Sequence, residues 1–207
     1  MLFFGKKKKK EDASDSQSEL DLVVIALGNI GAKYATTRHN AGWIVLDSLL
    51  SDSLVWSHNK YAQADCARSV VNGGVVEYVK PHTMMNNSGI SAQYALDKHN
   101  VSPNYMLVIY DDIDLPLGSM KMSFNRGSGG HNGIRSIEQH LGTPKFIRLR
   151  IGISKELEGG RVVKPNVLGN FEKEELELVE SLIPKVKEAI KLIVTKGREK
   201  AMNIVNA

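Results

Sequence analysis

Residues 22–31 read LVVIALGNIG, and this stretch decides the fold. The first six residues are apolar without a break, which is typical of a β-strand that is buried on both faces. A glycine-bounded turn, residues 28–31, follows the strand directly. Because such a strand belongs at the centre of a sheet with helices on both sides, the sequence predicts an α/β protein.

The rest of the chain alternates short β-branched runs with stretches of helical periodicity. Further strands are expected at residues 62–71, 75–80, 106–110, 119–124 and 146–153, and helices at residues 41–50, 85–99, 134–141 and 173–196. An Asn-Gly-Gly signal at residues 72–74 predicts a hairpin. We therefore expect one α/β domain, residues 21–207, with a mixed, twisted β-sheet covered by α-helices on both faces. The segment 155–170, rich in Gly, Lys and Glu, is expected to form a mobile loop beside the site.

The composition indicates a globular protein with one hydrophobic core. At 207 residues and 42% hydrophobic content, the chain is long enough for one core and short for two. Its single cysteine, Cys66, excludes an intramolecular disulfide and a cysteine-rich zinc site, which fits a reducing compartment such as the cytoplasm. No apolar run approaches the roughly 20 residues that span a bilayer, so no membrane partner is expected. Nor is there a long exposed apolar stripe, so we expect a monomer.

The first 20 residues, MLFFGKKKKKEDASDSQSEL, differ in kind from the rest. Five consecutive lysines precede an acidic, serine-containing run, and we expect residues 1–20 to form a disordered, charged tail. A secretory signal would place its basic residues before a longer apolar run, and a mitochondrial presequence would lack the acidic residues. The tail contributes a net charge of +1 to the total of +4, so the remainder of the chain is itself mildly basic. This charge permits a polyanionic partner without identifying one.

Polar residues occur at or just after the ends of several predicted strands. They are Asn29 after the first strand, Asn86 and Asn87 after VVEYVK, Asp111 and Asp112 after MLVIY, and His131 and Asn132 within GSGGHNG. Each of them, taken alone, could be a turn or cap residue. In an open α/β sheet, however, ligands bind in the crevice beyond the carboxyl ends of the strands. We therefore expect these side chains to share one cleft.

The stretch RHNAGW, residues 38–43, leads into the first predicted helix. Asn40 is explained as an N-cap whose side-chain oxygen accepts a helix N–H. His39 has no such explanation, and taken alone it is better understood as a hydrogen-bonded structural histidine than as a catalytic one. A position just before a helix N-terminus would nevertheless favour a neutral imidazole that can accept a proton.

Three familiar site patterns do not occur in the sequence. No Gly-x-Ser-x-Gly pentapeptide is present, which argues against a serine hydrolase. No His-Glu-x-x-His occurs and the six histidines are scattered, which argues against a zinc hydrolase. The glycine-rich stretch GSGGHNG lacks the spacing of both the dinucleotide fingerprint and the P-loop, so nucleotide binding is not expected.

Five parts of the sequence carry a recognisable pattern. They are ALGNIGAKYATTRHNAGW (26–43), KPHTMMNNSG (80–89), YDDIDLPLGSMKM (110–122), GSGGHNG (127–133) with RLRIGI (148–153), and GREKAMN (197–203). In this order they resemble the bacterial-type peptidyl-tRNA hydrolase family, over a span from about residue 20 to about residue 205. Two residues depart from the family pattern, because Ile30 stands where proline is usual and Tyr110 stands where histidine often precedes the aspartate.

The resemblance implies an enzyme that hydrolyses the ester between a peptide and the 3′ adenosine of tRNA, which recycles prematurely released peptidyl-tRNA during translation. Members of this family work without a metal or an organic cofactor. The resemblance assigns His39 as the catalytic base and Asp111 as its partner. It also implies that Asn29, Asn86 and Asn132 are active-site asparagines and that Tyr34, Met85 and His131 line the cleft.

Basic residues near these blocks predict a contact with tRNA. Arg150 matches a family arginine that grips a tRNA phosphate, while the companion lysine position holds Ser123 here. Lys121, two residues earlier, would share a strand face with Ser123 and could take over this role. Some relatives of the family are instead non-catalytic RNA-binding partners in splicing, and that alternative stays open.

The residue types suit ester hydrolysis. An ester has a tolerable alkoxide leaving group, so a water molecule activated by His39 and a few oxyanion donors suffice. A carboxylate on the other ring nitrogen would fix the histidine tautomer and stabilise the imidazolium as it forms. Strand alternation allows only one of Asp111 and Asp112 to face His39, and the family pattern selects Asp111. Asparagine carboxamides supply neutral donors that tolerate a varied peptide.

Overall fold

The computed structural model describes residues 20–50, 54–157 and 161–207. The predicted charged tail, residues 1–20, lies outside the described residues except for Leu20. That leucine is only 4% exposed and packs in the core, so it belongs to the folded domain rather than to the tail to which it was assigned. No helix in the described ranges combines the length and the apolar character that a bilayer crossing requires.

The described residues form one mixed sheet, as predicted, and this sheet has eight strands. The strands are β1 (Leu22–Ala26), β2 (Ser57–Asn59), β3 (Ala64–Val71), β4 (Gly74–Pro81), β5 (Met106–Pro116), β6 (Met120–Phe124), β7 (Ile147–Glu156) and β8 (Val162–Val163). Their order is β2-β3-β4-β1-β5-β7-β6, and β8 pairs with β7 off this path. The central neighbours β4, β1, β5 and β7 are parallel, whereas β2, β3, β6 and β8 join by antiparallel pairing. The carboxyl ends of the four central strands therefore meet at one edge of the sheet.

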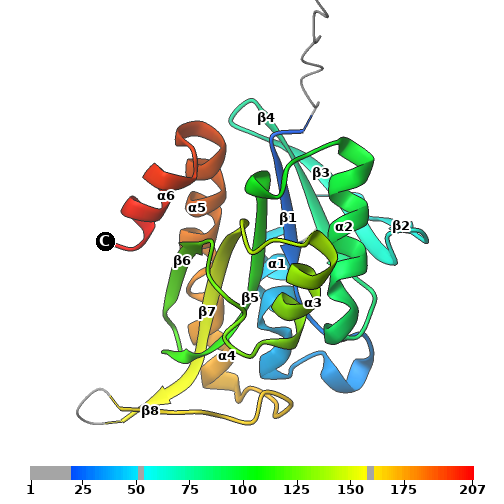
Figure 1. Cartoon of the computed structure of the whole chain (residues 1–207). Helices are drawn as coiled ribbons and strands as arrows, with labels where there is room; N and C mark the ends of the chain where they lie inside the picture. The colour runs from blue at the N-terminus through cyan, green and yellow to red at the C-terminus, as the bar shows by residue number, and fades with distance from the viewer. Residues whose placement is uncertain (1–19, 51–53, 158–160) are drawn as a thin grey trace, which may run out of the picture.

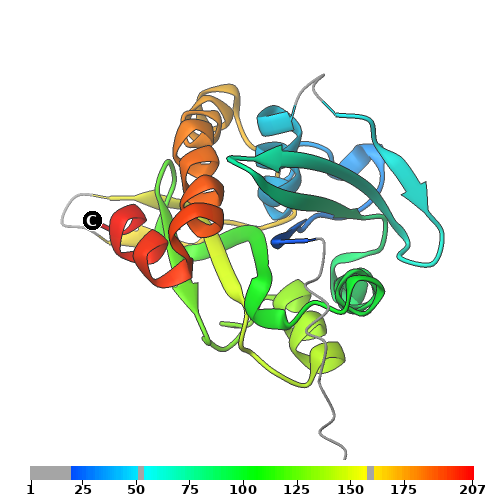
Figure 2. The same cartoon turned by 90° about the horizontal axis from the view of Figure 1, so that it is seen from above.

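Helices cover both faces of this sheet (Figures 1 and 2). They are α1 (Ala41–Leu50), α2 (Ser88–His99), α3 (Asn132–Leu141), α4 (Lys173–Glu180), α5 (Ile183–Lys196) and α6 (Arg198–Val205), with the short 3-10 helices η1 (Ala32–Tyr34), η2 (Arg38–Asn40), η3 (Met85–Asn87) and η4 (Pro103–Tyr105). The five residues of β1 are all fully buried, and their side chains alternate between two cores. Leu22, Val24 and Ala26 face α1 and α5. Val23 and Ile25 face α2 and α3 on the other side of the sheet.

Four parts of the fold differ from the prediction. The strand expected at residues 106–110 continues to Pro116, so Asp111 and Asp112 lie within β5 rather than after its end. The single helix expected at residues 173–196 is divided into α4 and α5, because Pro184 lies in the first turn of α5 and has no N–H with which to continue an earlier helix. The segment 155–170 was expected to be a loop throughout, but β8 pairs there with the end of β7. The short strand β2 and the helix α6 were not predicted, since three residues and eight residues give too little periodicity.

Close backbone packing places the start of α1 against the ends of β1 and β5. A Cβ atom on Gly42 would lie 2.4 Å from the carbonyl oxygen of Ile109 and 2.7 Å from that of Leu27. A side chain at this position would push α1 away from the sheet. Gly42 therefore lets η2, which immediately precedes α1, sit directly over the carboxyl ends of the central strands.

Candidate active site

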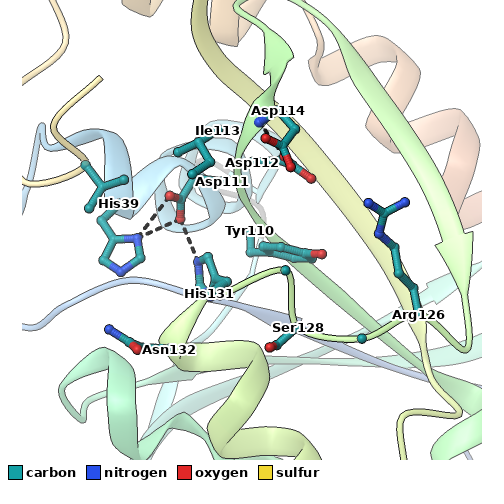
Figure 3. Close-up of a pocket in the computed structure, with 14 residues that line it drawn as sticks. His39, Tyr110, Asp111, Asp112, Ile113, Asp114, Arg126, Ser128, His131 and Asn132 are labelled. Atoms are coloured by element: carbon teal, nitrogen blue, oxygen red, sulfur yellow. Dashed lines mark hydrogen bonds and ion pairs between the residues drawn. The ribbon is translucent and has the colours of Figure 1, made fainter. Parts of the chain in front are cut away.

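A histidine and an aspartate meet at this edge of the sheet. His39 lies in η2, and its Nδ1 is 2.9 Å from Oδ1 and 3.0 Å from Oδ2 of Asp111 in β5 (Figure 3). Asp111 is 2% exposed and His39 is 7% exposed, so water competes little with this bond. Asp111 faces His39, whereas Asp112 points elsewhere and pairs with Arg150, which is the outcome that strand alternation and the family pattern predicted.

A second histidine fixes the protonation pattern of the pair. His131 lies at the N-cap of α3, where its Nδ1 accepts the backbone N–H groups of Gly133 and Ile134 at 3.2 and 3.3 Å. Because Nδ1 accepts, the ring proton of a neutral His131 sits on Nε2, which donates to Asp111 Oδ1 at 2.9 Å. Asp111 thus accepts from both imidazoles, and in a neutral His39 the proton is held on Nδ1. The Nε2 atom of His39 is left with a free lone pair.

The same arrangement keeps Asp111 ionised. Burial raises the pKa of its carboxyl group, but the hydrogen bonds and charge interactions with His131 and His39 lower it by more, so the pKa lies well below its usual range. Asp111 is consequently a carboxylate at neutral pH.

His39 is held from its other side by a strap formed by residues 166–171. The backbone N–H of His39 donates to the carbonyl of Val167 at 2.8 Å, and that of Arg38 donates to Gly169 at 3.0 Å. The Arg38 guanidinium also reaches Glu175 in α4 at 2.5 Å. The strap belongs to the segment that was expected to lie beside the site, and it fixes the backbone on which His39 sits.

Asn40 does not cap α1, contrary to the prediction. Its Oδ1 accepts the backbone N–H of Asn29 at 2.8 Å and its Nδ2 donates to the Asn29 carbonyl at 3.1 Å. Asn40 thereby connects the turn after β1 to η2, a role that the residues around RHNAGW alone could not reveal.

Asn29 accepts the backbone N–H of Met85 on its Oδ1 at 2.8 Å. This bond orients the Asn29 carboxamide and leaves its Nδ2 hydrogens as the group available to a substrate.

The structure places the predicted site residues in two groups. His39, Asp111, His131 and Asn132 line one pocket together with the glycine-rich loop of residues 127–130. Asn29 and Met85 are buried beside it, joined by the bond just described. Asn86 is exposed in η3, and Tyr34 is half-buried in η1 with Lys33 Nζ 4.8 Å from its ring centre.

His131 lines the pocket, but both of its ring nitrogens form hydrogen bonds within the protein. Its ring packs edge-on against Tyr110, with ring centres 4.8 Å apart. Tyr110 is one of the two departures from the family pattern, and here it supports the histidine that supports Asp111. His131 therefore acts on Asp111 rather than presenting a nitrogen to the pocket.

The two residues predicted to contact tRNA phosphate differ sharply in exposure. Lys121 lies opposite Arg150 across the β6–β7 pairing and is exposed. Arg150 is 4% exposed, and its guanidinium donates to Asp112 at 2.9 Å. An anion would have to compete with Asp112 for Arg150, whereas it would meet Lys121 freely. Arg126, which also lines the pocket, is a further exposed cation (Figure 3).

The site could also hold an ion by the criterion of distance alone. The ligand-type atoms of His39, Asp111 and His131 lie within 4.8 Å of one another. A metal there would displace the proton that His131 donates to Asp111. Instead, both ring nitrogens of His131, both carboxylate oxygens of Asp111 and Nδ1 of His39 already form hydrogen bonds. The Nε2 atom of His39 is left to accept a proton.

Fold and site together define the class of protein. It is a single-domain α/β protein whose parallel strands carry a buried histidine–carboxylate pair of the kind that hydrolytic enzymes use to take a proton from water. Residues 23–207 match the peptidyl-tRNA hydrolase family. The chain belongs to this family.

Individual relatives agree over almost the whole chain. The peptidyl-tRNA hydrolase of Thermotoga petrophila is 41% identical over 186 residues, which cover 90% of this chain and 97% of that protein. The peptidyl-tRNA hydrolase of Bacillus subtilis is 40% identical over 187 residues, covering 90% and 98%. A solved structure of peptidyl-tRNA hydrolase from Acinetobacter baumannii superposes with a TM-score of 0.79 at 33% identity, covering 92% of this chain and 96% of the other. The family expected from the sequence blocks is thereby confirmed.

Proposed function

We propose that this protein hydrolyses the ester bond between a peptide and the 3′ end of tRNA, releasing free tRNA and peptide. The observation that carries the proposal is the free Nε2 lone pair of His39, held in place by Asp111 on the opposite ring nitrogen. Family membership supplies the substrate class, since the relatives named above are peptidyl-tRNA hydrolases. None of these relatives supports the non-catalytic, RNA-binding alternative.

In the proposed reaction, His39 Nε2 accepts a proton from a water molecule as the oxygen attacks the ester carbonyl. The resulting imidazolium is stabilised by the ionised Asp111, which His131 holds in place from the other side. The Nδ2 hydrogens of Asn29 and the carboxamides of Asn86 and Asn132 are the neutral groups offered to the developing oxyanion and the peptide backbone. The imidazolium then returns the proton to the leaving 3′ oxygen of the ribose.

A turnover assay tests the proposal directly. Purified protein at catalytic concentration is mixed with an N-acylaminoacyl-tRNA, and free tRNA and N-acylamino acid are separated and counted. Many turnovers per protein molecule are expected, with the tRNA chain intact. Binding of the tRNA without release of the acylamino acid would favour the non-catalytic alternative.

Cation replacement tests the predicted tRNA contact. Lys121→Ala should raise KM and leave kcat nearly unchanged, because a phosphate contact made equally in ground state and transition state affects binding only. The salt dependence of binding should flatten by about one phosphate contact, a slope change of roughly 0.7 to 0.9 in log K against log salt concentration. Arg150→Ala should do the same and also lower the melting temperature, since it leaves Asp112 unpaired in a partly buried site.

Lys191→Ala is the matched control for the lysine variant. Lys191 lies on α5, away from the pocket, where it pairs with Glu188. Because both variants replace a lysine by alanine, they change the net charge of the protein by the same amount. If Lys121→Ala leaves the salt slope at the wild-type value, or if Lys191→Ala flattens it equally, the predicted phosphate contact is wrong.

We also propose that the protein acts as a monomer in the cytoplasm. The large exposed apolar side chains in the described ranges, such as Val55, Val70 and Leu168, belong to separate segments of the chain. Light scattering of the purified protein should therefore give the mass of one chain, 22.8 kDa.

A further inference from the structure

A second group of two histidines and one aspartate lies away from the pocket, on β2, on β3 and directly after the end of β4. His58 Nδ1 is 2.9 Å from Oδ1 of Asp65, and His82 Nε2 is 2.8 Å from Oδ2 of the same carboxylate. The two imidazole rings are 5.3 Å apart between centres. We propose that His58, Asp65 and His82 form a binding site for a divalent transition-metal ion of the Zn²⁺ type, which goes beyond the hydrolase function and does not rest on it.

The sheet register brings the three side chains to one face. His58 in β2 is directly opposite Asp65 in β3, and Asp65 is directly opposite Lys80 in β4. His82 follows Lys80 by two residues, so its side chain returns to the same face as that of Asp65. The backbone N–H of His82 donates to the carbonyl of Gln63 at 2.7 Å, which fixes the chain where it leaves β4.

The distances are close to those of a metal site. The three ligand atoms lie within 4.8 Å of one another. Ligand bonds of about 2.0 to 2.2 Å in a tetrahedral site place the donors roughly 3.4 Å apart. The two nitrogen–oxygen distances of 2.9 and 2.8 Å would therefore open by about 0.5 Å, and the widest separation in the group would close by at most about 1.4 Å. The His58 side chain is 55% exposed and can make this movement. Three protein ligands leave the remaining position to water.

The charges around Asp65 leave it available to a cation. Lys80, the residue opposite it in the sheet, turns away, because its Nζ contacts Asp47 at 2.6 Å and lies 4.7 Å from the ring centre of Trp43. The polar partners of the Asp65 carboxylate are therefore the two imidazoles. A divalent ion would take the place of the two ring protons that now bridge them, and each proton moves through solvent to the other nitrogen of its ring.

The donor set selects the kind of ion. Imidazole nitrogens with one carboxylate suit Zn²⁺, Cu²⁺, Ni²⁺ and Co²⁺, whereas Mg²⁺ and Ca²⁺ prefer oxygen ligands only. Cys66 is adjacent in sequence but lies on the opposite face of β3.

The test is metal binding by the full chain without a histidine tag, stripped with a chelator. Zn²⁺ is titrated in competition with a chromogenic chelator, and one equivalent should bind at this site. The His58→Ala/His82→Ala double variant should lose affinity by more than the roughly 10- to 100-fold that follows loss of an outer-sphere partner, because it removes two ligands. Zn²⁺ should also raise the melting temperature of the wild type and not that of the double variant, since the ion joins the edge strand β2 to β4.

Two further variants locate the binding. Glu188→Gln removes an exposed carboxylate on α5, away from the cluster and from Lys80, so it should bind Zn²⁺ as the wild type does. His39→Ala removes a ligand from the other histidine–aspartate group and should also keep the binding. Unchanged affinity in the double variant, loss of affinity in His39→Ala, or no binding by the wild type would each overturn the proposal. If the double variant does not melt cooperatively, Asp65→Asn decides by the same criteria.

Discussion

Replacing His39 by alanine is expected to lower kcat by about 100- to 10,000-fold, the usual contribution of general-base catalysis. The variant should still fold, because Asp111 keeps its bond to His131 and the lost hydrogen bond to the carboxylate contributes about 1.5 to 3 kcal/mol, less than the roughly 5 to 15 kcal/mol by which folded proteins are stable. Affinity for deacylated tRNA should persist, since it depends on phosphate contacts elsewhere. Single-turnover kinetics and a tRNA-binding titration on the same preparation measure both quantities.

The pH dependence of kcat gives an independent measure of the same role. In the wild type, kcat should fall as the pH is lowered, because protonation of His39 Nε2 removes the proton acceptor. Asp111 does not contribute this limb, since its pKa is held well below the usual carboxyl range. The limb should be missing from the residual activity of His39→Ala.

His39→Gln separates chemistry from positioning. A glutamine amide can still donate a hydrogen bond to Asp111 but has no basic nitrogen, so this variant should be as inactive as the alanine variant. Recovery of activity with glutamine, or near-normal kcat with alanine, would show that His39 shapes the site without accepting the proton. The base would then have to be sought elsewhere in the pocket.

The fold could be predicted from the sequence because its main signal is local. The unbroken apolar run of β1 indicates a strand buried on both sides, and the structure shows all five of its residues fully buried. The division between α4 and α5 also had a local signal, Pro184, which the helical periodicity around it concealed. Strand β2 gave no such signal, since its three residues hold their place through pairing with β3.

The site was only partly predictable, because much of it is made by backbone groups. Any residue supplies a carbonyl, so nothing in the sequence marks Val167 as the acceptor for the backbone N–H of His39. Asn40 was assigned to the nearest helix end, yet its partner is Asn29, eleven residues earlier. Arg150 can be buried because its guanidinium pairs with Asp112. That neighbour could be predicted only if the pairing of β5 with β7 were already known.

The histidines show the same limit. The family resemblance placed His39 and His131 in one site, but nothing in the sequence paired His58 with His82, and the absence of His-Glu-x-x-His argued against a zinc hydrolase. The parallel and antiparallel pairings nevertheless bring four of them into two groups, each arranged around one aspartate. In one group a helix N-terminus fixes the tautomer of His131, and in the other both rings simply face Asp65. The surroundings of each aspartate, and not the residue types, make one group a proton acceptor and the other a candidate metal site.

The second large effect is expected at Asp111. In Asp111→Asn, the carboxamide oxygen would remain with His131, whose Nε2 must donate, and the amide nitrogen would then face Nδ1 of His39. Since that nitrogen is a donor, it stabilises the His39 tautomer protonated on Nε2, which cannot accept a proton from water. An analogous change in the serine protease triad costs about 10,000-fold, and we expect a loss of kcat of about 100- to 10,000-fold here.

Asp112→Asn is the matched control, because it makes the same chemical change one residue further along β5. Asp112 lies on the other side of the strand and pairs with Arg150, so its replacement should cost about 1 to 3 kcal/mol of folding free energy through the unpaired guanidinium, with kcat changed little. The two variants should therefore separate cleanly, one losing turnover at nearly constant melting temperature and the other losing melting temperature at nearly constant turnover. If Asp112→Asn has the larger effect on kcat, the assignment of Asp111 as the partner of the catalytic histidine is wrong. Equal losses of kcat in both variants would instead locate the effect in the shape of β5, since that strand carries both carboxylates to the edge of the sheet.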